Sequence, residues 1–151
     1  MSVSIALHIL ASAIWVGGMF FAYVALRPAA AQVLEPPQRL ALWIESFKRF
    51  FVWVWLSILV LIVTGYWMVF SIFGGFDSVG LHVHLMHGMG IVMMLIFFHV
   101  YFAPYRRLRH AVIIEDYPEG GRRLGQIRML VGLNLTIGLF VIAIASAGRY
   151  L

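Results

Sequence analysis

Four long apolar segments alternate with short polar connections along the chain. The segments cover about residues 3–26, 50–73, 81–103 and 127–148. Each is long enough to cross the roughly 30 Å hydrocarbon core of a bilayer, which takes about 20 helical residues. Because backbone groups inside a bilayer must be bonded within the protein, such spans form helices. The pattern predicts an all-α fold, an integral membrane antiparallel four-helix bundle that forms a single domain over residues 1–151.

The composition supports a membrane protein and limits its chemistry. Hydrophobic residues make up 63% of the 151 residues and charged residues only 11%, whereas soluble domains carry about 25% charged residues. The start of the chain lacks the basic segment of a signal peptide, so we expect the first span to be retained. The chain has no cysteine, which excludes disulfides and thiolate-held metals. Any metal must be held by histidine, methionine, carboxylate or amide groups.

The cations are concentrated in the first and third connections and predict the orientation. The second connection carries only Asp77 as a charged residue. Because cytoplasmic connections are enriched in lysine and arginine, we expect the first and third connections to be cytoplasmic and both termini to face the other side. The net charge of +5 then reflects topology and contact with the anionic headgroups of the lipid bilayer, and we expect no nucleic-acid partner. Ten of the cations lie in or beside the two basic connections: Arg27, Arg39, Lys48, Arg49, Arg106, Arg107, Arg109, Arg122, Arg123 and Arg128.

Two further patterns concern helix packing. The segment "PPQRLALWIESFKRF" (residues 36–50) has Leu40, Trp43, Ile44 and Phe47 at helical spacing, which predicts a short amphipathic helix lying in the membrane interface. The last span carries a stripe of small residues with one buried amide, typical of a close helix–helix contact. That stripe contains Asn134, Gly138, Ala145 and Gly148.

Histidines lie inside these spans, where ionisable groups are costly and are usually functional. His8, His84 and His87 are all within about 10 Å of the non-cytoplasmic end at 1.5 Å per residue. His84 and His87 share a face of the third span with Gly88, and we expect that face to point into the bundle, because a small residue allows close approach. His82, Met86, Met89 and Met93 form the opposite stripe.

The first span supplies further polar groups at the same end. His8 shares a stripe with Ser12 and Trp15. The candidate cofactor-binding residues are therefore His8, Ser12, Trp15, His84, His87 and Gly88, of which the three histidines are the candidate metal ligands. Ser57 and Thr64 of the second span, with Trp53, could support a ligand. For the remaining groups, ordinary roles are the expectation: a solvated His82 and His110, and methionines that fill gaps.

Three segments carry a family resemblance. They are "LHILASAIWVGGMFF" (residues 7–21), "FFHVYFAPYRRLRHAV" (97–112) and "GRRLGQIRMLVGLNLTIGL" (121–139), and they resemble CopD-type copper-resistance membrane proteins of bacteria. The chain is more distantly similar to HemJ-type protoporphyrinogen oxidases, haem-binding bundles with an "LHxK" motif. In "GLHVHLMH" the histidine of that motif is His82 and its lysine position holds His84. These resemblances imply a multi-pass protein of the bacterial inner membrane. In that membrane, the orientation predicted by the charges places both termini in the periplasm.

Three functions follow as alternatives. In the first, one b-type haem near the periplasmic side is ligated by His8 and by His84 or His87, giving an electron-transfer protein or a haem-dependent oxidoreductase that works with quinol or a periplasmic redox partner. In the second, histidine and methionine bind copper for transport or resistance. The third is a HemJ-like protoporphyrinogen oxidase. A structural or assembly subunit without a metal is the alternative outside these chemistries. We favour haem because its two ligands would lie at one depth. The sequence leaves open whether the protein is a monomer or a homo-oligomer.

Overall fold

The computed structural model describes residues 2–148 and is helical almost throughout. Residue 1 and residues 149–151 of the predicted single domain lie outside the described residues. The main helices are α1 (Ser2–Phe21), α2 (Arg27–Val33), α3 (Pro36–Ser71), α4 (Leu81–Phe102), α5 (Pro104–Ile113) and α6 (Tyr117–Ala147). No strand occurs between residues 2 and 148. The predicted all-α membrane bundle is confirmed.

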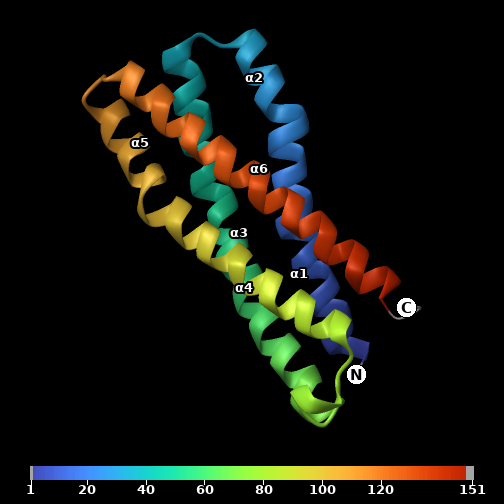
Figure 1. The fold of residues 1–151 in the computed structure, drawn as a ribbon. Coiled ribbons are helices and arrows are strands. Elements are labelled where there is room, and N and C mark those ends of the chain that lie inside the picture. The colour runs from blue at the N-terminus through green and yellow to red at the C-terminus, as the bar shows by residue number, and fades with distance from the viewer. Residues whose placement is uncertain (1, 149–151) are drawn as a thin grey trace.

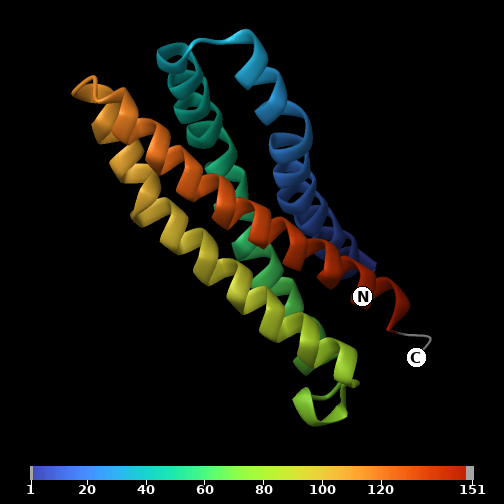
Figure 2. The ribbon, with the colours of Figure 1, turned by 45° about the horizontal axis from the view of Figure 1, so that its top comes forward.

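The helices form four segments that are long and apolar enough to cross a membrane. They cover Ser2–Val33, Pro36–Ser71, Leu81–Ile113 and Tyr117–Ala147, and each overlaps one predicted span. The two ends of the described chain lie at one end of the bundle together with the connection from α3 to α4, while the α2–α3 and α5–α6 turns lie at the other (Figures 1 and 2). The chain is thus a multi-pass membrane protein whose surface contacts the bilayer. We call the two ends the terminal end and the turn end.

The segment from residue 36 is not a separate interfacial helix, which corrects the sequence interpretation. Pro36 begins α3, as expected of a proline at a first helical position, but α3 continues unbroken to Ser71. Leu40, Trp43 and Phe47 are buried. Phe47 packs edge-on against Tyr105 of α5, with ring centroids 6.0 Å apart. The apolar face therefore contacts α5 and α6, so no interfacial lipid is needed to cover it.

Prolines account for the two irregular points in the first and third segments. Between α1 and α2 the backbone widens into a π-helical turn over Ala22–Leu26, where the Arg27 amide donates to the Ala22 carbonyl. Pro28 follows and has no amide hydrogen to donate, which loosens the ladder at this place. Between α4 and α5, Ala103 leaves the helical conformation immediately before Pro104, because proline disfavours the helical region for the residue that precedes it.

The bundle is packed tightly toward the turn end and loosely at the terminal end. Aromatic rings of α3, α4 and α5 interlock in the packed half; the rings of Phe51 and Phe97 lie 5.3 Å apart and nearly perpendicular. By contrast, residues 2–10, 81–92 and 139–147 contain no buried residue. Three of the four spans are therefore loosely packed at the terminal end, where most of the histidines within the spans lie.

Candidate functional site

The orientation of α4 differs from the sequence prediction. His84 and Gly88 are exposed, and Leu95 on the same face is 60% exposed. The inward face is instead the one that contains Met93 and Phe97, each 4% exposed. The prediction that the His84 and His87 face points into the bundle centre is therefore wrong.

Contacts with α6 fix this orientation. The Asn134 side-chain amide donates to the Met93 carbonyl, at 3.3 Å. The Met93 methyl group and Val16 of α1 both pack against Gly138, so the predicted small-residue contact with a buried amide is present. Because Met93 points inward, Met89, Met86 and His82 follow on the same side of α4 at helical spacing. They are half-buried.

His84 and His87 lie in a small aromatic cluster beside the α3–α4 connection. The Phe76 ring is 5.9 Å from the His84 ring and 5.1 Å from the His87 ring. Tyr66 of α3 meets the His87 ring edge-on at 5.5 Å. The two imidazoles are thus brought together around one phenyl ring at the periphery of the bundle.

His8 is held by a chain of hydrogen bonds to α3. Its Nδ1 lies 2.8 Å from the Thr64 hydroxyl oxygen, and that hydroxyl donates to the Val60 carbonyl at 2.6 Å. A threonine hydroxyl has only one proton to donate, so Nδ1 of His8 must carry the hydrogen that bonds to Thr64. This tautomer leaves the lone pair of Nε2 free to accept a proton or to bind a metal.

The other predicted residues of α1 have structural contacts. The Ser12 hydroxyl donates to the His8 carbonyl at 2.9 Å, so it is bonded to its own helix. Trp15 is buried and meets the Phe97 ring edge-on at 6.2 Å. Ala11, Trp15 and Met19 are all buried, which places the stripe that begins at His8 on the inward face of α1.

His8 and the inward stripe of α4 lie at one depth. Val16 and Met93 meet at the same residue, Gly138, and α1 and α4 both start at the terminal end. Counting toward that end, His8 is eight residues from Val16 and Met86 is seven from Met93, which is about 12 Å and about 10 Å along the helices. The first imidazole and the α4 thioethers therefore lie at about the same depth in the loosely packed half of the bundle.

The structure does not gather the predicted ligands into one cluster. Within residues 2–148, no three histidine, aspartate or glutamate side chains are grouped as a metal site would require. The contacts of His8 are with Thr64 and Gly65, and those of His84 and His87 are with the aromatic cluster. Ligation of one group by His8 and by His84 or His87 remains a prediction.

Sequence reasoning found Thr64 only as a weak signal and missed a second feature altogether. Ser57 and Thr64 are buried, but Trp53, placed with them on one stripe, is 56% exposed. Arg27, Arg39 and Arg128 line one cavity at the turn end, whereas the sequence suggested only a role in orientation and in general contact with lipid headgroups for them. No signal in a single sequence pairs arginines that are so far apart along the chain.

Comparison with known proteins gives one family. The family model described as CopD, copper resistance protein D, matches residues 44–147. No curated protein matches the chain, and no solved structure matches it. The matched region runs from the first third of α3 to the end of α6 and covers more than half of the sequence. The chain belongs to the CopD family.

Proposed function

We propose that this protein binds copper(I) as its cargo, in copper resistance, from within the inner membrane. The family match supports copper as the metal. The observation that carries the proposal is the inward stripe of α4, which offers one imidazole and three thioethers: His82, Met86, Met89 and Met93. Thioether and imidazole are ligands that suit copper(I).

The site would lie at the open terminal end. His8 faces it from α1 with its Nε2 lone pair available, at the depth of Met86. The donors of α4 extend over eleven residues, about 16 Å along the helix axis. Beyond Met93 the core closes around Trp15, Phe51 and Phe97. This arrangement favours loading of copper from the terminal end and a dry barrier toward the turn end.

Copper(I) binding by methionine variants tests the proposal. Detergent-purified protein is titrated anaerobically with copper(I) against a chromogenic competing chelator. The double substitution Met86→Leu and Met93→Leu keeps the size and apolarity of the side chains but removes two thioethers. We expect the affinity for copper(I) to fall by at least about tenfold, as loss of groups around a metal typically does.

Met129→Leu is the matched control. Met129 belongs to α6 and is 67% exposed, so its substitution should leave copper(I) binding unchanged. A wild-type protein that takes up no copper(I), or a double variant that binds it as tightly as the wild type, would contradict the proposal.

One b-type haem is the second candidate, because the free Nε2 of His8 could also bind a haem iron. The other imidazole would come from His84 or His87, and electrons would pass between haem and a quinol or a periplasmic redox partner. The absorption spectrum of the purified protein separates the candidates. A sharp reduced α-band that His8→Ala abolishes and His110→Ala keeps would replace copper with haem.

A further inference from the structure

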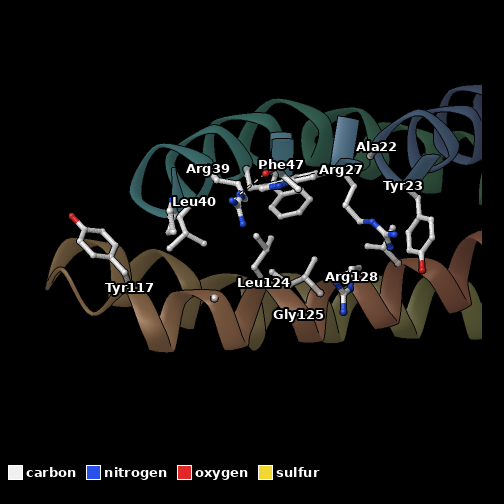
Figure 3. A pocket seen from close by; sticks show the side chains of 16 residues that line it. Ala22, Tyr23, Arg27, Arg39, Leu40, Phe47, Tyr117, Leu124, Gly125 and Arg128 are labelled. Atoms are coloured by element: carbon white, nitrogen blue, oxygen red, sulfur yellow. Dashed lines mark hydrogen bonds between the residues drawn. The ribbon is translucent and has the colours of Figure 1, made fainter. Parts of the chain in front are cut away.

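A cavity of about 300 Å³ lies at the turn end, far from the proposed copper site. It is bounded by the turn between α1 and α2, the start of α3 and the first half of α6 (Figure 3). Each of these three elements contributes an arginine: Arg27, Arg39 and Arg128. The side chains of Arg27 and Arg39 extend into the space between the helices (Figure 3).

The positive charge in this cavity is not balanced by the protein. None of the cavity-lining residues is acidic. Within residues 2–148, the ion pairs are those of Glu45 and Glu119 with neighbours on their own helices, and none includes the three arginines. The guanidinium groups of Arg27 and Arg39, which extend into this space (Figure 3), produce a field that attracts an anion.

Arg39 has a donor that is left without a partner. Its Nη2 donates to the Leu34 carbonyl at 3.0 Å and to the Ala31 carbonyl at 3.4 Å, which fixes the side chain at the α2–α3 turn. Its Nε is buried and has no hydrogen-bond partner. A buried donor without an acceptor costs free energy, and an oxyanion in the cavity would supply the acceptor through a strong charge-assisted bond.

Most of the remaining lining is apolar, and the cavity adjoins the predicted cytoplasmic end of the first span. Trp43, Phe47 and Leu124 form part of its wall. Arg27 follows the predicted end of the first span and lies over the Tyr23 ring, 4.5 Å from its centroid. Pro36, also in the lining, begins α3, whose amino-terminal end carries partial positive charge. A ligand whose phosphate contacts the arginines and whose hydrocarbon chain packs on the apolar wall would match both parts of the lining.

We propose that this cavity binds the phosphate of an anionic phospholipid from the adjacent leaflet, with an acyl chain against the apolar wall. Basic pockets between membrane helices on the cytoplasmic side are suited to such headgroups. Inorganic phosphate shares the charge of the headgroup but lacks the chain, so it is the soluble ligand against which the lipid must be tested.

The test measures lipid binding by native mass spectrometry of the delipidated full chain in detergent. Phosphatidylglycerol is titrated, with phosphatidylcholine as the zwitterionic comparison. We expect preferential retention of phosphatidylglycerol, and an affinity at least about tenfold weaker after Arg27→Gln or Arg39→Gln, because each removes a charge-assisted bond. Arg107→Gln, at an exposed position of α5 outside the lining, removes the same charge and should retain the lipid.

A cavity-filling variant covers the case in which an arginine substitution disturbs folding. Gly125 lines the cavity, and a Cβ at this position would meet no atom within 4 Å. Gly125→Leu therefore adds side-chain volume to the apolar part at a position with room for its Cβ, and leucine is a better helix former than glycine. We expect a folded protein that loses phosphatidylglycerol and keeps its affinity for copper(I).

Three results would overturn the proposal. They are equal retention of phosphatidylglycerol and phosphatidylcholine by the wild type, unchanged phosphatidylglycerol binding in the folded Arg27→Gln and Gly125→Leu variants, and displacement of the lipid by inorganic phosphate at equal concentration. The last result would assign the cavity to a soluble anion.

Discussion

At the scale of single residues, one hydroxyl group determines what His8 can do. Thr64 gives its only proton to the Val60 carbonyl and therefore accepts the hydrogen of His8 Nδ1. The ring is fixed in one tautomer and one orientation before any ligand arrives. Such partners of a ligating histidine orient the ring and raise its basicity as a ligand.

Thr64→Val should therefore weaken copper(I) binding without removing a ligand. Valine has nearly the shape of threonine but no acceptor, so the Nδ1 hydrogen of His8 loses its bond. We expect the copper(I) affinity to fall by about 10- to 100-fold, measured in the same chelator competition, while His8→Ala should lower it at least as far. Thr64→Ser restores the hydroxyl and should restore most of the affinity. An unaffected Thr64→Val protein would show that the bond serves folding only.

At the scale of helices, the number of spans was predictable and the inward face of α4 was not. The length and apolarity of each span follow from the thickness of the bilayer. Apolarity does not distinguish the inward face of α4 from its lipid-facing side, because lipid accepts apolar side chains as readily as a neighbouring helix does. Contacts with Asn134 and Gly138 of α6 decide the orientation instead. The sequence thus indicated that histidines are concentrated at one end of the bundle, but it did not indicate which of the two α4 stripes faces inward.

Substitutions at two glycines test which face of α4 points inward, through their effect on the stability of the bundle. A Cβ on Gly138 would lie 2.9 Å from Val16 and 3.1 Å from Met93, whereas one on Gly88 would meet nothing within 4 Å. Gly138→Ala should lower stability by about 1–3 kcal/mol through overpacking. Gly88→Ala should be neutral or raise stability by up to about 1 kcal/mol, because alanine favours the helix. Thermal unfolding in detergent, followed by circular dichroism, measures both; the opposite ranking would mean that α4 presents its other face to the bundle.

At the scale of the whole molecule, the two ends of the bundle differ in packing and in charge. The turn end has the interlocked aromatic core and ten of the 11 lysines and arginines. The terminal end has loosely packed spans and the imidazoles of His8, His82, His84 and His87. Because the proposed copper donors and the proposed lipid phosphate lie at opposite ends, the orientation of the chain decides which compartment each site faces.

The charges predict that the turn end is cytoplasmic and both termini periplasmic. The two ends of the described chain lie at one end of the bundle (Figure 2), so a single fusion after Leu151 reports the side for both. Alkaline phosphatase, which is active only after export, should be active at this position, and a green fluorescent protein fusion should be dark. A fusion in the connection between α5 and α6, near Glu115, should give the reverse pair of results. A fluorescent carboxy-terminal fusion would mean that the bundle has the opposite orientation in the membrane. The proposed copper donors would then be loaded from the cytoplasm.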